Sequence, residues 1–392
     1  MQPLTSRQQA MVALADQLAA QFAARAAAHE RAGTFPLENY RDLHTSGYLR
    51  LIVPQAYGGA GANLHEMVLA QEHLARGDGS TAMAMNMTVH LIGRLGETRQ
   101  WPEAVFARVC REIVEEGALI NAAATEPEMG SPSRGGVPST RAEPVGGGWK
   151  IFGHKQFVSM AAALRFFVVS VALPQSAAYP EGAIANAIIH AGSAGIRLED
   201  TWSDALSLRS SGSNDLWLDG VFVPHEMIVD VRPVGSNPPQ KTPVQMAWFS
   251  LTMAAIYLGI GQAACDSVCA YARERTPTAL GRPIATLPHV QHRVGEMKVQ
   301  LDAARTYLHL VAQTWSEQPS QQPTLTPQIA AAKYLCTNAA VAATDQALRI
   351  AGGFGLMSKL PLERFFRDAR AGLTHPPADD QALEMVGKAA LE

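Results

Sequence analysis

The chain has 392 residues and a formal net charge of −3, a length that indicates two or three domains. Hydrophobic residues make up 47% and charged residues 17%, which is typical of a globular protein and excludes an intrinsically disordered one. No basic run is present, so the sequence does not indicate a positively charged surface that would bind nucleic acid.

The amino-terminal third has helical periodicity. Apolar residues recur at helical spacing in residues 4–30, and Thr5 or Ser6 can cap that helix. Further helices are predicted after Pro36, over about 64–76, after Ser80 and after Pro102. We therefore expect an all-helical domain over residues 1–120.

Residues 121–232 differ in composition from the segments on both sides. Gly, Pro, Ser and Thr are frequent there, and they separate short apolar or alternating runs. This pattern predicts a small antiparallel β-barrel or sandwich. Strands are expected at 139–144, 149–152, 165–172, 185–190, 195–198 and 215–223.

The carboxy-terminal segment, residues 240–392, returns to helical periodicity. Long helices are predicted at 246–275, 290–318 and 326–352, and a last helix near Pro376 or Pro377. Four long helices without internal repeats favour a four-helix bundle. The whole chain is thus predicted to be mostly α with a central β domain.

Cysteine usage and the amino-terminal sequence bear on metal binding and location. The four cysteines, at 110, 265, 269 and 336, form no CxxC pair and have no nearby histidines, which predicts free thiols and no metal site. The start of the chain lacks a cationic segment followed by an apolar one, and no run of 18 or more apolar residues occurs. We expect a cytoplasmic protein without a membrane span.

Several short motifs occur in a fixed order along the chain. They are VPQAYGG at 53–59, Ala124-Thr125-Glu126-Pro127 followed by Gly130-Ser131, Gly153-x-Lys155 ending at Ser159, Leu208-Arg209-Ser210-Ser211 followed by VFVP at 221–224, Gly281-x-Pro283-Ile284, and Gly352-Gly353-x-Gly355 leading to Arg367-Asp368-Ala369. With helical, β and bundle segments in this order, the chain resembles the acyl-CoA dehydrogenase superfamily over essentially its whole length. The resemblance implies an FAD-dependent oxidoreductase and a homotetramer.

A flavin ring has apolar faces and polar edges, so its site needs backbone N–H groups, a hydroxyl and a side chain that packs on the ring. The resemblance implies that Thr125 serves the polar edge, that Phe157 covers the ring and that Ser159 lies near N5. It also implies contacts to the pyrophosphate, some of them from a neighbouring subunit. The cofactor-binding residues expected in this way are Ala124, Thr125, Gly130, Ser131, Phe157, Ser159, Arg275, Arg349, Gly352 and Gly353.

The usual catalytic base of the family is missing. Removing an α proton from an acyl thioester needs a carboxylate whose pKa is raised by burial. The family places this carboxylate at the position of Pro376 or, in some members, of Phe249, and it often has an arginine at the position of Leu251. The candidate catalytic residues that remain are His375, Ser159, His90, Asp379 and Asp380.

Three functions stay open at this point. The first is a divergent dehydrogenase of an acyl thioester, bound to CoA or to a carrier protein, that passes electrons to an electron-transfer flavoprotein; Asp379 or Asp380 could supply its base. The second resembles the monooxygenase branch of the superfamily, which receives reduced flavin (FAD or FMN) from a reductase and would set His375, His90 and Ser159 around it. The third is a flavin- or acyl-binding protein without turnover. In either enzyme the substrate would be a small molecule.

Overall fold

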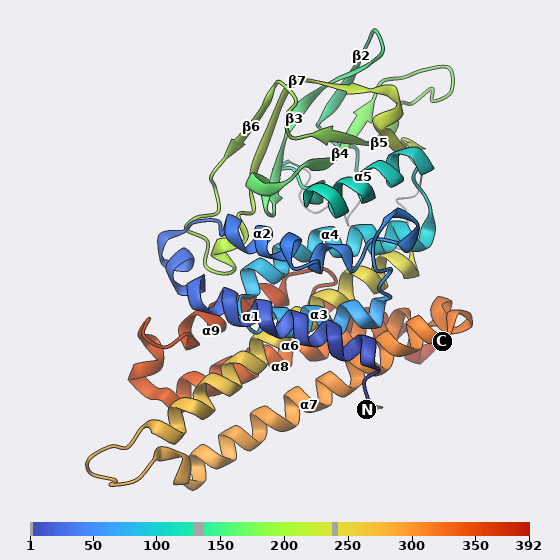
Figure 1. Cartoon of the computed structure of the whole chain (residues 1–392). Coiled ribbons are helices and arrows are strands. Elements are labelled where there is room, and N and C mark those ends of the chain that lie inside the picture. Colours follow the sequence, from blue (N-terminus) through green and yellow to red (C-terminus); the bar gives the residue numbers. More distant parts are fainter. Residues whose placement is uncertain (1–2, 129–135, 237–241) are drawn as a thin grey trace.

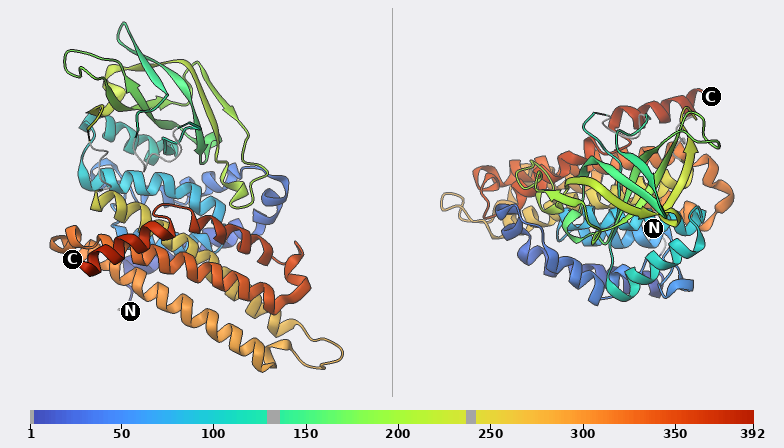
Figure 2. Two further views of the ribbon diagram at one scale, coloured as in Figure 1. Left: turned by 180° about the vertical axis from the view of Figure 1, so that it is seen from behind. Right: turned by 90° about the horizontal axis from the view of Figure 1, so that it is seen from above.

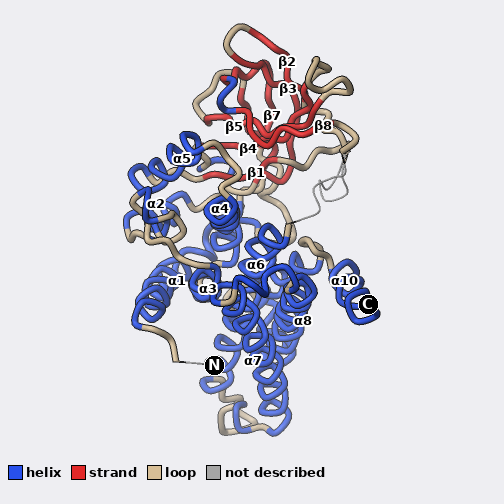
Figure 3. Tube along the Cα trace, turned by 90° about the vertical axis from the view of Figure 1, so that its right-hand side faces the viewer, coloured by secondary structure: helices blue, strands red, loops and turns tan. Residues whose placement is uncertain are grey.

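Helices from both ends of the chain pack together beneath the sheet that the middle of the chain forms (Figure 1). The computed structural model describes residues 3–128, 136–236 and 242–392. Figure 2 and Figure 3 show the same separation from other sides, with the strands gathered at one end of the molecule. The predicted class, mostly α with a central β domain, is confirmed.

The first and third of the amino-terminal helices begin at the residues that the sequence marks as caps, whereas the fourth begins at Gly79, with Asp78 and not Ser80 as its cap. Thr5 and Gln8 form a capping box on the first helix, and Asn63 and Glu66 form one on the third. These helices are α1 (Ser6–Ala32), α2 (Leu37–Thr45), α3 (Leu64–Ala75), α4 (Gly79–Thr98) and α5 (Glu103–Glu116). Helices α3 and α4 are buried along most of their length; α4 packs against β1 of the sheet, and α3 packs on α6, α1 and α7 beneath it.

The sheet is mixed, with most neighbouring strands antiparallel. Its strands are β1 (Ile120–Ala123), β2 (Arg141–Val145), β3 (Gly148–Val158), β4 (Phe166–Leu173), β5 (Ala183–His190), β6 (Ile196–Glu199), β7 (Asn214–Pro224) and β8 (Ile228–Pro233). The strand order is β6-β7-β3-β2-β4-β5-β8, and β1 pairs with β4 outside this path. Two pairings, β1 with β4 and β2 with β4, are parallel, whereas the sequence predicted antiparallel pairing throughout.

The carboxy-terminal helices surround one apolar helix. They are α6 (Pro243–Glu274), α7 (Pro288–Glu317), α8 (Thr326–Ala351), α9 (Leu362–Arg370) and α10 (Asp379–Leu391). Helix α6 is long and apolar enough to cross a membrane by length and composition, but 83% of its most apolar window is buried inside the protein. It is therefore the core helix of the bundle, where it contacts α3, α4, α7 and α8.

Candidate functional site

The residues predicted to meet a flavin ring lie together at the end of β3. The carbonyl of Thr125 accepts a hydrogen bond of 2.9 Å from the backbone N–H of Gln156, which sets the loop after β1 beside β3. Phe157 lies in a bulge of the β3–β7 ladder with φ of 58°, and its side chain is 58% exposed. Such a backbone angle is costly for a bulky residue, and here it holds a flat apolar ring outward, next to Trp202 at 5.8 Å.

Ser159 belongs to a row of three hydroxyl groups beside this aromatic surface. Its Oγ is 2.8 Å from Oγ of Ser213, which is in turn 2.8 Å from Oγ of Ser211. The carbonyl of Ser159 accepts from Nδ2 of Asn121 on β1, which fixes the strand end. An exposed aromatic face next to rotatable hydroxyls fits the apolar face and polar edge of a flavin.

A buried ion pair holds the loop next to this surface in place. Nζ of Lys155 is 2.5 Å from Oε1 of Glu126, and both side chains are fully buried. Burial alone would raise the pKa of Glu126, but hydrogen bonds from Lys155, Thr140 and Ser139 outweigh it and lower the pKa to about 2. The Gly-x-Lys motif therefore fixes the loop that carries Thr125, because the next residue, Glu126, is tied to the sheet interior.

His375 lies in the loop between the short helix η10 (Ala371–Leu373) and α10. Its Nδ1 is 2.6 Å from the hydroxyl of Tyr257, which projects from α6. Burial, and then the charge of Lys333, lower the pKa of His375 to about 4, so the imidazole is neutral at pH 7. If Nδ1–H donates to the tyrosine oxygen, Nε2 is left with a free lone pair; if the tyrosine donates, Nε2 carries the proton.

His90 projects from α4 towards α6. Its ring meets Phe249 of α6 edge-on, with 5.0 Å between centroids. Burial, and then the charge of Arg94, lower the pKa of His90 to about 3. The contact between α4 and α6 at this position therefore consists of one aromatic ring and one neutral imidazole.

The two candidate carboxylates at the start of α10 have other surroundings. Oδ2 of Asp379 accepts from Nδ2 of Asn338 at 3.0 Å, and Oδ1 lies 3.7 Å from Nζ of Lys333. Lys333 is fully buried and donates to the carbonyl of Gly372 at 2.6 Å. Asp379 is thus the counter-ion of a buried cation, and Asp380 is exposed to solvent. These contacts favour structural roles over the role of a base.

Leu208 and Asp368, for which the sequence predicted no role, connect the turn that carries the serines to the helix that leads to His375. The backbone N–H of Leu208 donates to Oδ1 of Asp368 at 2.7 Å, and burial raises the pKa of Asp368 to about 7. This bond ties the turn that carries Ser211 to α9, which leads to His375. Tyr257 and Lys333 were missed as well, and their one sequence signal is a polar side chain inside an apolar helical run.

The residues expected at the adenosine half of the cofactor lie at the far end of α6 and α8 (Figure 1). The guanidinium of Arg275 lies 4.9 Å from the ring centroid of Phe354, so it adjoins the turn Gly352–Gly353. Arg349 pairs with Asp345 one helical turn away, and its side chain is mostly exposed. Gly130 and Ser131 lie outside the described residues.

No group of three or more potential metal ligands occurs within residues 3–128, 136–236 and 242–392.

Three domain models of the acyl-CoA dehydrogenase family match the chain: the N-terminal domain over residues 5–104, the middle domain over 121–221 and the C-terminal domain over 244–376.

Curated relatives extend over nearly the whole chain. The putative acyl-CoA dehydrogenase YdbM of Bacillus subtilis is 39% identical over 377 residues, 96% of this chain and 95% of the relative. The L-evernosamine nitrososynthase of a Micromonospora species is 29% identical and covers 94% of this chain and 87% of its own.

Two solved structures show the same fold. Butyryl-CoA dehydrogenase from Megasphaera elsdenii has a TM-score of 0.85 at 24% identity, with 100% of this chain and 99% of that chain covered. TdsC from Paenibacillus sp. A11-2 with FMN and indole has a TM-score of 0.85 at 24% identity, with 97% and 96% covered. The chain therefore belongs to the acyl-CoA dehydrogenase family of flavoprotein oxidoreductases that act on CH–CH groups.

Proposed function

We propose that the protein is an FAD-dependent dehydrogenase of an acyl thioester in which His375 replaces the missing carboxylate base. The observation that carries this proposal is the position of His375, one residue before Pro376, with its ring held by Tyr257 at 2.6 Å. The identity of 39% with a putative acyl-CoA dehydrogenase over nearly the full chain supports the substrate class.

In this proposal, bound FAD would supply the hydride acceptor, and side chains of the protein would hold the flavin and take the α proton. Phe157 would pack on the ring, while Thr125 and Ser159 would hold its polar edge. Nε2 of His375 would take the α proton, in the tautomer in which Nδ1–H donates to Tyr257. Because burial and Lys333 disfavour the charged imidazole, this base is weak, and we expect slower flavin reduction than a buried carboxylate gives.

The test is anaerobic mixing of the FAD-loaded protein with acyl-CoA esters of increasing chain length. Bleaching of the flavin absorbance is expected for at least one ester. His375→Gln should slow that bleaching by about 10²-fold or more, which is the usual contribution of a general base. Asp380→Asn, at an exposed position of α10, is the matched control and should leave the rate unchanged. Equal rates in His375→Gln and the wild-type protein would refute the role of His375.

A second candidate function is a monooxygenase that receives reduced FAD or FMN from a partner reductase. Two observations favour it: the neutral rings of His90 and His375, and the lack of a carboxylate at Pro376 and Phe249. The relatives named nitrososynthase and the FMN-containing structure of TdsC add support. In this reaction, Nε2–H of His375 and Oγ of Ser159 would act as hydrogen-bond donors. Oxygen uptake by the photoreduced protein, with no bleaching by any acyl-CoA, would select this function.

A further inference from the structure

A cavity of about 260 Å³ lies among α1, α3, α6 and α9 and shares no lining residue with the flavin face. Its polar lining consists of Arg76, Asp266, Ser267 and Arg364. The other lining residues are two alanines, Gly77, Pro361 and Phe365. Two arginines that meet in a small cavity need anions to balance them, so the contacts of each guanidinium decide what the cavity can hold.

Arg364 of α9 is the least satisfied of these groups. Only 6% of the residue is exposed, and its Nη1 is buried without a hydrogen-bond partner. Among the described residues its guanidinium makes no hydrogen bond or ion pair, and its one direct contact of note is with the ring of Phe365 at 5.2 Å. A buried cation without acceptors is costly, and because Arg364 lines the cavity, an acceptor bound there would offset that cost.

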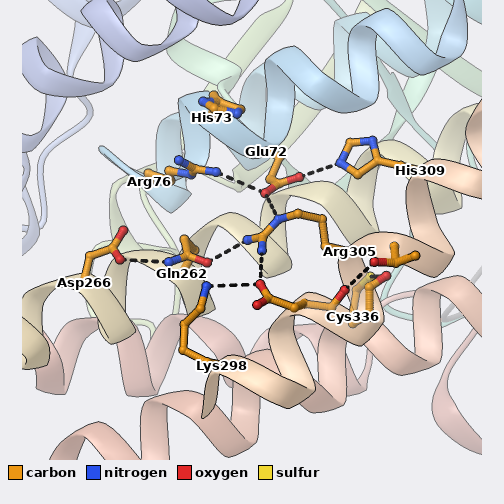
Figure 4. Close-up of polar contacts among 12 residues, drawn as sticks. Glu72, His73, Arg76, Gln262, Asp266, Lys298, Arg305, His309 and Cys336 are labelled. Carbon is orange, nitrogen blue, oxygen red and sulfur yellow. Dashed lines mark hydrogen bonds and ion pairs between the residues drawn. The ribbon is translucent and has the colours of Figure 1, made fainter. Parts of the chain in front are cut away.

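Arg76 reaches the cavity from the end of α3. Its Nη2 donates to Oε1 of Glu72 at 3.2 Å, but its Nε is buried without a partner. Figure 4 shows Arg76 and Asp266 on the same side of the hydrogen-bonded cluster around Glu72. Oδ1 of Asp266 accepts a hydrogen bond of 2.8 Å from Nε2 of Gln262. Two arginines therefore line the cavity, each with one N–H group that has no protein acceptor, beside the carboxylate of Asp266.

We propose that this cavity binds inorganic phosphate. The guanidinium groups of Arg76 and Arg364 both line the cavity and are donors suited to the oxygens of an oxyanion, and the Ser267 hydroxyl can donate to a third oxygen. The carboxylate of Asp266 can accept only from an anion that keeps a proton, as the P–OH of phosphate does near neutral pH. Sulfate has no such proton and would face Asp266 with like charge. Phosphate is therefore preferred over sulfate.

Calorimetric titration and thermal unfolding of the full-length protein, dialysed into chloride buffer at matched ionic strength, test this site. Phosphate should bind and raise the Tm with increasing concentration, and sulfate should bind at least about tenfold more weakly. Arg364→Gln should weaken phosphate binding by about tenfold or more. Arg370→Gln, on the same helix but outside the cavity lining, is the matched control and should bind as the wild type does.

A second variant keeps the test decisive if Arg364→Gln does not fold. Asp266 is exposed on the surface of α6, so Asp266→Asn is expected to fold normally. Its amide can donate to sulfate, and the two anions should then bind with similar affinity. The proposal is overturned if the wild type binds neither anion, if Arg364→Gln folds and keeps full phosphate affinity, or if Asp266→Asn keeps the original preference.

Discussion

Lys155 reaches Glu126 through the interior of the β domain, and neither side chain is exposed. Lys155→Met would leave the carboxylate of Glu126 charged and buried, with only the Ser139 and Thr140 groups as donors. Breaking a buried pair from one side costs about 3–5 kcal/mol, so the free energy of unfolding in urea should fall by that amount. Lys150→Met, at an exposed position of the same strand, is the control. Equal stability of the two variants would contradict the assignment.

The pH dependence of stability should report the histidines whose pKa is lowered in the fold, which include His90 and His375 as well as His65. The pKa of His90 is lowered from 6.5 to about 3 and that of His375 to about 4, in both cases by burial first. Below pH 6.5 the unfolded chain binds protons that the folded protein excludes, so stability falls as the pH falls from 6.5 towards 4. His90→Gln should flatten this slope in urea unfolding series at pH 7, 6 and 5. An unchanged slope would mean that His90 is not neutral in the folded protein.

The residue-level expectations differ in how far the sequence could support them. Phe157 and Ser159 follow Gly-x-Lys at a fixed spacing, and because the motif is local, their grouping could be predicted. The contact between Tyr257 and His375 spans 118 positions and depends on how α6 packs against the loop before α10. The ion pair of Lys333 with Asp379 depends on the same packing, so spacing alone assigned Asp379 a catalytic role that its surroundings do not favour.

Among the helices, α3, α6 and α7 are joined by a buried polar network centred on Glu72 (Figure 4). Its carboxylate accepts from Nε of Arg305 at 2.8 Å, Nε2 of His309 at 2.9 Å and Nη2 of Arg76 at 3.2 Å. Burial would raise the pKa of Glu72, but the charges and hydrogen bonds of these partners outweigh it and lower the pKa well below its usual range.

Glu72→Ala should therefore be among the most destabilising substitutions of the helical layer. It leaves Arg305 and Arg76 without their carboxylate in a largely buried position, with an expected loss of about 3–5 kcal/mol in the free energy of unfolding. Glu384→Ala, in an exposed pair with Lys388 on α10, serves as the control and should leave the urea midpoint unchanged. Equal midpoints for Glu72→Ala and the wild type would show that the network contributes nothing.

The elements themselves were largely predictable because their signals are local. Helices with a capping box and an apolar stripe were expected close to their observed bounds. Strands β1 and β8 were not expected, since four residues of INAA and six of IVDVRP give no clear alternation. The parallel pairing of β1 with β4 also escaped prediction, because it joins segments more than 40 residues apart through tertiary packing.

As a whole molecule, the protein leaves apolar side chains exposed on the outer bundle helices. Val299 on α7 is 71% exposed, Leu310 on α7 58% and Leu335 on α8 40%. The family resemblance implies a homotetramer, and we expect copies of the chain to bury this surface against one another. Analytical ultracentrifugation should give four times the monomer mass of 42.0 kDa, and Val299→Asp should shift the protein towards smaller species. A monomer at micromolar concentration would contradict this expectation.

The electron acceptor is the other property of the whole molecule that can be tested. A dehydrogenase should pass its electrons to an electron-transfer flavoprotein, so adding one should restore the oxidised flavin spectrum after anaerobic reduction. A monooxygenase should instead need a reductase that supplies reduced flavin. Rapid reoxidation by oxygen that yields a hydroxylated product, with no response to the flavoprotein, would favour the monooxygenase.

The most direct test of the central claim is the anaerobic titration of the FAD-loaded protein with acyl-CoA esters. We predict that at least one ester bleaches the flavin absorbance, and that His375→Gln slows this reduction by about 10²-fold while still binding FAD. If no acyl thioester reduces the flavin, although the protein binds FAD and its photoreduced form consumes oxygen, the dehydrogenase proposal is wrong.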